Sequence, residues 1–422
     1  MKILHVSTFD GGGAAKAAIR LHLSLIKSNC DSSILFLYKQ NNSIPKSYKY
    51  ENKQNLNIGS LKRYFFRIRN KLKPIEILKS EINKKLLENK VSGFEIFSFN
   101  SSDFDITTQK IYQEADIIHL HWTAGFLDFD FFTKNTKPIV WTLHDMNPFT
   151  GGCHYSLGCD KFKIDCSKCP QLEGTIDNNN SNSNLFYKLN TLKKSKVVIT
   201  APSRWLKKCS EESVLFSSFK HELIPYSLDF ETFNLKNKSF SKSVFNLPND
   251  KKVLLFVSDT VENIRKGFDL LLNSLKGFNV DDYHLCCVGS SNKMKLNTLN
   301  ITYTGKINDE RLMALLFSSA DAFILPSIED NLPNVMLESL ACGTPVVCFA
   351  KGGMLDVIKT GLNGIIIEDF NEESLRMAIL DVINERYKFD SIQIANDASK
   401  MFSEKRQAKS YIEQYRNLII DK

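Results

Sequence analysis

Short apolar runs bounded by turn residues alternate with helical patterns along almost the whole chain. The first half contains KILHVS, SILFLY, DIIHLHW, PIVWTLHD, KVVITAPS and HELIPY, and the second half contains KVLLFVS, YHLCCVG, ITYTG, DAFILPS, TPVVCFA and NGIIIE. These runs are continuous rather than alternating in polarity, which is typical of strands that are buried on both faces of a parallel sheet. Their alternation with helices predicts an α/β fold with doubly wound sheets.

The alternation of strands and helices pauses between about Ser227 and Lys251, which divides the pattern into two parts. A chain of 422 residues, 43% of them hydrophobic, can bury two cores of roughly 200 residues each. We therefore expect two Rossmann-like domains, over 1–228 and 245–400, and a helix at about Glu404 to Ile420. Ligands of such sheets bind outside the carboxyl ends of the strands, so we expect the site after DAFILPS, KILHVS and PIVWTLHD.

The overall charge does not by itself indicate a partner. Lys and Arg number 55 against 47 acids, and a net charge of +8 over a large surface predicts no nucleic-acid binding. The apolar run in MKILHVSTFDGGG has about five residues and predicts a strand rather than a signal peptide. No apolar run reaches the roughly 18 residues of a membrane span. We therefore expect a cytoplasmic protein whose ten cysteines are reduced thiols or metal ligands.

The stretch IEDNLPNVMLESLACGTPVV joins a loop, a helix and a strand, and it carries two acids eight residues apart, Asp330 and Glu338. Pro333 suits the first turn of the helix, which Gly343 and Pro345 would end. The free backbone N–H groups at the start of such a helix form an anion site that favours a diphosphate.

The two acids would lie on either side of this anion. Glu338, one turn deeper in the helix, offers only acceptor atoms, which suits a vicinal diol such as the 2′ and 3′ hydroxyls of a ribose. Asp330 would accept hydroxyls of the group that the diphosphate carries. From the spacing alone a second interpretation stays open, in which Asp330 only complements the helix dipole and Glu338 faces solvent.

Several motifs, in order, resemble a known enzyme family. DNLPNVMLESLACGTPVV closely resembles the E-x7-E motif of retaining glycosyltransferase family 4, in the variant with Asp at the first acid. GGGAAKAAIRLHLSLI resembles the glycine-rich first loop of that family, IVWTLHD its central histidine loop, and FVSDTVENIRKGFDLLL its basic diphosphate loop. DIIHLHWTAG and TLHDMNPFTGGCHYSLGC resemble the branch that builds bacterial exopolysaccharide, O-antigen and colanic-acid-type chains. The resemblance covers nearly the whole chain and implies the GT-B fold, in which two Rossmann-like domains face a central cleft.

The resemblance implies roles for the domains and for three catalytic residues. Domain 1–228 would bind the acceptor, with the helix 404–422 packing back on it, and domain 245–400 would bind the nucleotide sugar. Lys266, in RKG, would neutralise the charge that develops on the departing nucleotide. Asp330 would bind the transferred sugar, and His144 would contact it from the loop after PIVWTLHD.

In that family a basic pair, rather than a metal, holds the diphosphate. The usual Arg of the pair has no counterpart at Ser258, Asp259 or Thr260, and Arg265 is the candidate replacement. The donor-binding residues that the resemblance implies are Glu338, Lys266, Arg265, Gly12, Gly13, Asn331, Leu332, Pro333 and Asn334.

Gly11 and His121 are the residues implied on the acceptor side. Gly11 belongs to the glycines after the first strand, where a backbone without side chains can approach a ligand closely. His119 and His121 alternate in DIIHLHW, and we expect one of them to face the core, which leaves His121 as the candidate.

Four cysteines, Cys153, Cys159, Cys166 and Cys169, fall within seventeen residues. Cys166 and Cys169 have the C-x2-C spacing of zinc ligands, whereas the other gaps are looser than in common zinc ribbons. A structural zinc is one interpretation, and four unliganded thiols with a packing role are the other. Catalysis is expected to need no cofactor.

Residues 61–90 hold ten Lys or Arg against three Glu, with Leu, Ile and Phe between them. A basic amphipathic stretch lies readily on an anionic membrane surface, which suits a lipid-linked acceptor and a peripheral position on the inner face of the plasma membrane. Solvated helices that cover the first domain are the alternative.

The resemblance therefore implies a retaining, metal-independent hexosyltransferase. It would move a sugar from a UDP- or GDP-linked donor to a lipid-linked oligosaccharide in cell-surface polysaccharide biosynthesis. Two alternatives stay open. A non-catalytic nucleotide-sugar-binding scaffold of the same fold is supported by the missing Arg, and a nucleotide-sugar epimerase of the same architecture would need no acceptor.

Overall fold

The structure is a computed structural model that describes residues 1–52, 87, 90–91, 95–99, 101–172, 180–192, 195–290 and 300–420. The chain divides into two compact units. The first unit comprises Met1–Ala201, Lys207–Glu222 and Tyr411–Lys422, and the second comprises Pro202–Leu206 and Leu223–Ser410.

The break that the sequence places between Ser227 and Lys251 is not where the units separate. The second unit already begins at Leu223, and the segment contains a helix, α8 (Lys238–Val244). The Nζ atom of Lys238 lies 2.8 Å from Oδ1 of Asp321, next to the central sheet of that unit. The pause in the pattern therefore marks an added helix that packs on the second unit rather than a linker.

A seven-stranded sheet, in the order β3-β2-β1-β4-β5-β6-β7, forms the centre of the first unit, and its pairs from β3 to β6 are parallel. The strands are β1 (Lys2–Phe9), β2 (Asp31–Tyr38), β3 (Ser47–Lys49), β4 (Ile117–Leu120), β5 (Ile139–Thr142), β6 (Val197–Ala201) and β7 (Lys220–Leu223). The helices and 3-10 turns are α1 (Gly13–Lys27), η2 (Ile106–Thr108), α4 (Lys110–Glu114), α5 (Phe131–Lys134), η3 (Asn147–Phe149), η4 (Lys161–Lys163), α6 (Asn180–Leu192) and α7 (Arg204–Glu211).

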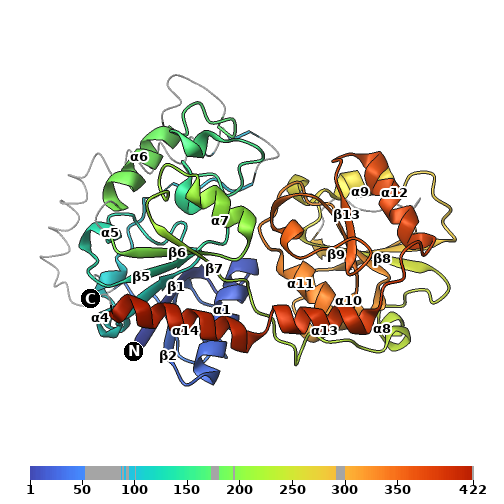
Figure 1. Ribbon diagram of the computed structural model, residues 1–422, viewed down its shortest axis with the longest axis horizontal. Coiled ribbons are helices and arrows are strands. Elements are labelled where there is room, and N and C mark those ends of the chain that lie inside the picture. Colours follow the sequence, from blue (N-terminus) through green and yellow to red (C-terminus); the bar gives the residue numbers. More distant parts are fainter. Residues whose placement is uncertain are drawn as a thin grey trace, which may run out of the picture. The chain divides into compact units, whose positions relative to one another are not determined.

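A six-stranded parallel sheet, in the order β10-β9-β8-β11-β12-β13, forms the centre of the second unit. Figure 1 shows α9 and α12 on one side of this sheet and α8, α10, α11 and α13 on the other. The strands are β8 (Lys252–Thr260), β9 (Tyr283–Ser290), β10 (Ile301–Gly305), β11 (Ala322–Leu325), β12 (Val346–Phe349) and β13 (Gly364–Ile367). The helices and 3-10 turns are η5 (Ile264–Lys266), α9 (Phe268–Ser274), α10 (Glu310–Ser319), α11 (Asn334–Ala341), η6 (Gly352–Asp356), α12 (Glu372–Ile383) and α13 (Ser391–Met401).

The strand orders confirm two doubly wound, Rossmann-like sheets. Numbered along each unit, the strands follow the order 3-2-1-4-5-6, with β7 added at the edge of the first sheet. Ligands of such sheets bind where the order reverses, which is between β1 and β4 in the first unit and between β8 and β11 in the second. The loops that follow these strands carry most of the candidate site residues.

Each of the twelve predicted strands is present, and β4, β5, β6, β11 and β12 are buried along their whole length. Coverage of both faces explains why these runs are continuously apolar. The strand β3 was not predicted, because its sequence SYK is short and lies partly exposed at the edge of the sheet.

The predicted C-terminal helix is present as α14 (Glu404–Ile420), of which the part from Tyr411 onward belongs to the first unit. The hydroxyl of Tyr415 lies 2.5 Å from Nδ1 of His119 on β4, and that of Tyr411 lies 2.7 Å from Oγ1 of Thr142 on β5. The last turns of α14 are therefore bonded to the middle of the first sheet.

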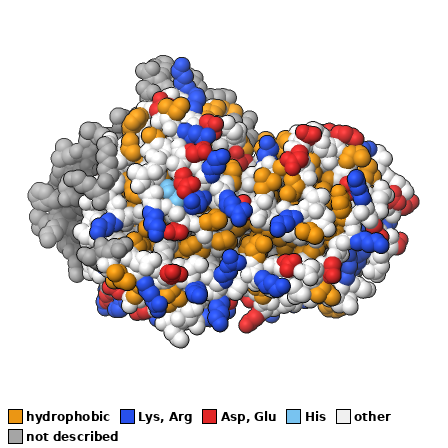
Figure 2. Space-filling model, viewed as in Figure 1, with side chains coloured by type: hydrophobic (Ala, Val, Ile, Leu, Met, Phe, Trp, Pro, Cys, Tyr) orange, Lys and Arg blue, Asp and Glu red, His pale blue; other side chains and the backbone are white. Residues whose placement is uncertain are grey.

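On the face shown in Figure 2, Lys and Arg side chains are interspersed with Asp and Glu over the coloured, described residues. This mixture agrees with the mild net charge of +8. None of the described helices combines the length and the apolar character that crossing a membrane requires.

Candidate functional site

In the second unit, two cations converge on Asp330. The turn η5 follows β8 and carries Arg265 and Lys266, while Asp330 follows β11, so the residues meet at the point where the strand order reverses. Lys266 donates from Nζ to Oδ2 of Asp330 at 2.6 Å, and Nη1 of Arg265 lies 3.1 Å from the same oxygen. The backbone also joins the two loops, because the N–H of Ile328 donates to the carbonyl of Arg265 at 2.8 Å.

The electrostatics of this cluster favour the ionised form of Asp330. Burial by itself raises the pKa of Asp330, but the charges of Lys266 and Arg265 outweigh burial and lower the pKa to about 2. The carboxylate is therefore ionised at neutral pH. Asp330, to which both cations bond, lies a few residues before the N-terminus of α11, and cations beside a helix N-terminus suit a phosphate anion.

The helix α11 begins at Asn334, one residue later than predicted, with Pro333 as its N-cap. Gly343 has φ of 77° directly after the helix, as predicted for its end. Asn331, Leu332 and Pro333 are buried, and Asn334 is partly exposed. The N–H of Asn331 also donates to Oδ1 of Asp330 at 3.2 Å. The expectation of free amides from Asn331 onward is therefore wrong at Asn331 itself.

Glu338 lies in the second turn of α11 and is 3% exposed. This burial excludes the alternative in which its carboxylate faces solvent. A bound diol is the ligand that the sequence interpretation assigns to this carboxylate, which also interacts within the protein.

Sequence reasoning missed the loop that supports Asp330. Gly352 and Gly353 follow β12 in the stretch KGG, and the N–H of Gly353 donates to the carbonyl of Asp330 at 3.0 Å. A Cβ atom on Gly352 would lie 1.8 Å from the same carbonyl oxygen. Ser203 adds a further contact, since its Oγ donates to Oδ1 of Asn331 at 2.6 Å. The GG pair after a strand was the only sequence signal for this contact.

In the first unit, the three predicted glycines connect β1 to α1. Gly12 is the N-cap of α1 with φ of 87°, and a Cβ atom on Gly11 or Gly12 would meet nothing within 4 Å. The backbone here is accessible at the carboxyl end of β1, beside the reversal of the strand order. Gly13 is the first residue of the helix.

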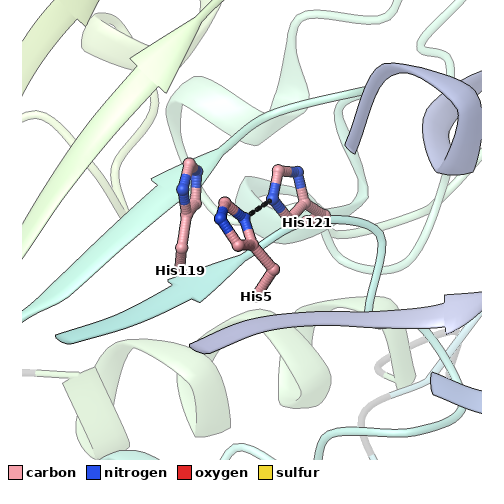
Figure 3. Close-up of side chains that lie close together, drawn as sticks. All are labelled: His5, His119 and His121. Atoms are coloured by element: carbon pink, nitrogen blue, oxygen red, sulfur yellow. Dashed lines mark hydrogen bonds between the residues drawn. The ribbon is translucent and has the colours of Figure 1, made fainter. Parts of the chain in front are cut away.

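His121 and His144 are brought together in a chain of buried imidazoles. Nδ1 of His121 lies 3.1 Å from Nε2 of His144, and Nε2 of His121 lies 2.9 Å from Nδ1 of His5. Figure 3 shows His5 and His121 joined by this second bond, with His119 beside them. Both His119 and His121 are buried, so the expectation that only one of them faces the core is wrong, since residues i and i+2 of a strand point to the same face.

Each bond in this chain needs one protonated and one bare nitrogen, and a neutral imidazole has one of each. The protons must therefore all point in the same direction. Nε2 of His5 is buried and has no hydrogen-bond partner among the described residues. A bare nitrogen is tolerated there better than an unpaired N–H, which favours His144 with Nε2 bare and Nδ1 protonated.

One ring nitrogen from each of His5, His119 and His121 lies within 4.8 Å of the other two, which is close enough for a shared metal ion. Both nitrogens of His119 are already bonded, however, to the hydroxyls of Tyr415 and Thr142 at 2.5 and 2.7 Å. A metal would have to displace these bonds and the one between His5 and His121. The arrangement is better described as a hydrogen-bonded cluster than as a metal site.

A cavity of about 390 Å³ lies where β4 and β5 end, and both His121 and His144 line it. Asp145 lies beside them and was not predicted as a site residue. Its Oδ2 accepts hydrogen bonds from Nε1 of Trp122 at 2.7 Å and Nδ1 of His154 at 2.6 Å. Burial raises the pKa of Asp145, but His154 and the other donors outweigh it and lower the pKa. The sequence gives no signal for this pair, because eight residues without a regular repeat separate its members.

Residues 237–401 match the model of the family described as glycosyl transferases group 1. The matched residues lie within the second unit and include the Arg265, Lys266 and Asp330 cluster and Glu338. The second unit therefore carries a glycosyl transferases group 1 domain.

Relatives that match the chain include an uncharacterized glycosyltransferase of Methanocaldococcus jannaschii, 28% identical over 191 residues, or 43% of this chain and 47% of that protein. The chain thus spans about half the length of this relative. A longer match, 23% identical over 337 residues, relates 77% of the chain to 86% of an uncharacterized 41.2 kDa protein in the cps region of Klebsiella pneumoniae.

Among solved structures, Anabaena HepE in complex with UDP and glucose has a TM-score of 0.65 and 15% identity, over 99% of each chain. WaaG, a glycosyltransferase involved in lipopolysaccharide biosynthesis, has a TM-score of 0.57 and 14% identity, over 96% of this chain and 95% of that chain. These likenesses concern the fold, and they confirm the expected GT-B class.

Proposed function

We propose that the protein is a retaining, metal-independent glycosyltransferase. It moves a hexose-type sugar from a UDP- or GDP-linked donor to a lipid-linked oligosaccharide of a cell-surface polysaccharide. The observation that carries this proposal is the cluster of Arg265, Lys266 and Asp330 within the glycosyl transferases group 1 domain. Two cations around one carboxylate, close to a helix N-terminus, suit the diphosphate of a nucleotide sugar.

The donor residues belong to the second unit. In this proposal Lys266, with Arg265 as the second cation, binds the diphosphate and stabilises the charge that develops on the departing nucleotide. Glu338 accepts the hydroxyls of the ribose, and Asp330 accepts hydroxyls of the sugar. Asn334, which is partly exposed at the start of α11, offers the helix N-terminus to the diphosphate.

The acceptor residues belong to the first unit. His121 and His144 line the cavity of about 390 Å³, and Gly11 lies in an open turn at the carboxyl end of β1. In this proposal His144 contacts the transferred sugar and His121 lies on the acceptor side. Since no carboxylate is assigned as a nucleophile, the leaving phosphate takes the acceptor proton on the same face of the sugar, which gives retention.

Support for the substrate classes comes from the similar structures. HepE was solved with UDP and glucose, and WaaG is a glycosyltransferase involved in lipopolysaccharide biosynthesis. The sequence identities to these structures are low, so the nucleotide of the donor has to be determined by experiment. Nucleotide sugars should be screened by thermal stabilisation, since a ligand at about 100 times its Kd adds about 2.7 kcal/mol of stability.

Turnover of the stabilising donor then decides between the candidate functions. A glycosyltransferase releases nucleoside diphosphate at a rate that rises when a lipid-linked acceptor is added. A scaffold binds the nucleotide and releases none from the sugar, and an epimerase converts the donor without any acceptor. Nuclear magnetic resonance of the product tests retention, because an inverted anomeric configuration contradicts the proposed mechanism.

Membrane association is a further part of the proposal. The basic segment 61–90 lies outside the described residues, apart from 87 and 90. The full chain should sediment with anionic vesicles and not with neutral ones, because each basic residue near the headgroups contributes about 1 kcal/mol. Equal recovery in the supernatant with both kinds of vesicle would leave only the interpretation of solvated helices.

A further inference from the structure

The four clustered cysteines line a single cavity in the first unit. They come from the loop between β5 and α6, and the cavity measures about 290 Å³. The rings of Phe97 and Phe162 form part of its wall. Burial raises the pKa of Cys153, and the three neighbouring cysteines raise it further. The cysteines that share this cavity are Cys153, Cys159, Cys166 and Cys169.

Backbone N–H groups bond to two of these cysteines. The N–H of Gly151 donates to Sγ of Cys166 at 3.2 Å. The backbone N–H of Leu172 donates to the carbonyl of Cys169 at 3.3 Å, which fixes the turn after this cysteine. Amides that point at a sulfur stabilise the thiolate over the neutral thiol. The amide of Gly151 thus favours negative charge on the sulfur of Cys166.

A buried lysine lies next to the same cavity. Lys188, on α6, is 0% exposed, and its Nζ donates to the carbonyls of Asn147 and Thr150 at 2.5 and 3.0 Å. Among the described residues it forms no ion pair with a carboxylate. Burial lowers the pKa of Lys188 to about 7, and Cys166, Cys153 and the carboxylate of Asp145 oppose that shift. A buried ammonium is stable only with a compensating negative charge.

We propose that the four cysteines bind one Zn²⁺ as a tetrathiolate and that Lys188 compensates the charge of this centre. Four thiolates and one Zn²⁺ carry a net charge of −2, and the four thiol protons are released to solvent on binding. The C-x2-C pair supplies two ligands, and the earlier cysteines of the loop supply the other two. The site is structural, because all four positions around the metal are filled by protein.

Binding would draw the sulfur atoms together. Among the described residues, only the histidine cluster has three or more candidate ligand atoms within 4.8 Å of one another, so the four sulfurs lie further apart. In a zinc site each sulfur lies about 2.3 Å from the metal. Because His154 directly follows Cys153 and bonds Asp145, the metal would also fix the loop beside the cavity that His144 lines.

The metal content of the full chain tests this proposal without any assay of sugar transfer. The protein is purified under reducing conditions, incubated with Zn²⁺, desalted, and analysed by atomic emission. We expect about one zinc per chain, released when the thiols are alkylated. A zinc content below about 0.2 per chain, iron in place of zinc, or disulfides between these cysteines would overturn the proposal.

Two variants locate the metal. Cys166→Ser should reduce the zinc content to below about 0.2 per chain, whereas Cys348→Ser, at a buried cysteine of the second unit, should keep about one. Retention of zinc by Cys166→Ser would refute this ligand set. If Cys166→Ser does not fold, Co²⁺ replaces Zn²⁺ in the wild-type chain. The intense absorption of a tetrahedral cobalt thiolate is expected, and its absence contradicts the site.

Lys188→Met tests the charge compensation. We expect a chelator to remove zinc from this variant about tenfold faster than from the wild type, which corresponds to about 1.4 kcal/mol. An unchanged rate of removal would show that Lys188 does not stabilise the metal centre. Lys207→Met serves as the control, because that lysine lies on α7 and bonds Glu211 at the surface.

Discussion

The two cations around Asp330 differ in how much solvent they meet. The side chain of Lys266 is 18% exposed and that of Arg265 is 7% exposed. The more accessible Lys266 is therefore the better placed to reach a departing phosphate. We predict that Lys266→Ala lowers kcat by about 10² to 10³, as loss of one charge-stabilising donor does, with a smaller change in KM.

Steady-state kinetics with the donor found by screening measure this effect. The matched control is Lys306→Ala, since Lys306 is 57% exposed and its one ion pair among the described residues is with an exposed Asp259 in the same unit. A kcat of the Lys266 variant equal to that of the control would remove Lys266 from the catalytic set.

Glu338 offers a separate test of donor binding, because its carboxylate is assigned to the ribose rather than to the reacting atoms. Replacing the charged acceptor by a neutral amide weakens a hydrogen bond of about 1.5 to 3 kcal/mol. We predict that Glu338→Gln raises the Kd of the nucleoside diphosphate at least about tenfold. Calorimetric titration measures this, and Glu373→Gln on the exposed start of α12 is the control. Unchanged affinity would contradict the assignment.

At the scale of elements, the loop after β12 determines where the turn before α11 lies. Gly352 has φ of 60°, and an added Cβ would meet the carbonyl oxygen of Asp330 at 1.8 Å. Gly305 has a similar φ of 70° and nothing within 4 Å. Both glycines would be strained by a side chain, but only a side chain at Gly352 would also push against Asp330. Alanine variants at the two positions therefore distinguish backbone strain from displacement of Asp330.

We predict that Gly305→Ala costs only the strain of a left-handed residue, about 1 to 2 kcal/mol, and leaves donor affinity unchanged. Gly352→Ala should lower stability further and also weaken donor binding, because the turn that carries Asp330 must move. Thermal unfolding and calorimetric titration of both variants measure the two effects. Equal donor affinity in the two variants would show that the loop does not position Asp330.

The elements were predictable from sequence to a much greater extent than the contacts between them. Continuous apolar runs indicate buried parallel strands, so each predicted strand was found, and the same logic placed Asp330 after the end of a strand, whereas Lys266 was identified by the family resemblance. Which partner Asp330 takes was not predictable, because its bond to Lys266 joins loops 64 residues apart in the chain. The bond between His119 and Tyr415 joins residues 296 apart.

At the scale of the whole molecule, both units use the same strand order, yet their charges at the strand ends differ. The second unit gathers two cations and one carboxylate between β8 and β11, which suits an anionic ligand. The first unit gathers neutral imidazoles beside β1, β4 and β5, which suits hydroxyl groups. Two copies of one architecture can therefore present different chemistry at the same place in the fold.

The buried imidazoles also predict how the stability of the first unit depends on pH. Burial lowers the pKa of His5, His119 and His121 well below 6.5, and it lowers that of His144 to about 4, although Asp145 opposes the last shift. In the unfolded chain these groups bind protons below a pH of about 6.5, whereas in the folded protein they do not. Stability is therefore complete above that pH and is lost as the pH falls through the window from 6.5 to 4.

For His144 alone this loss amounts to about 3 kcal/mol by pH 4, since one unit of pKa corresponds to 1.36 kcal/mol. Urea unfolding at several pH values measures it. Tryptophan fluorescence reports mainly on the first unit, which contains Trp122 and Trp141.

His144→Gln should flatten the dependence of the free energy of unfolding on pH between pH 6.5 and 4. The carboxylate of Asp330, with a pKa of about 2, titrates below this window and does not obscure it. A slope that is the same in the variant as in the wild type would mean that His144 gains its proton as readily in the folded chain as in the unfolded one.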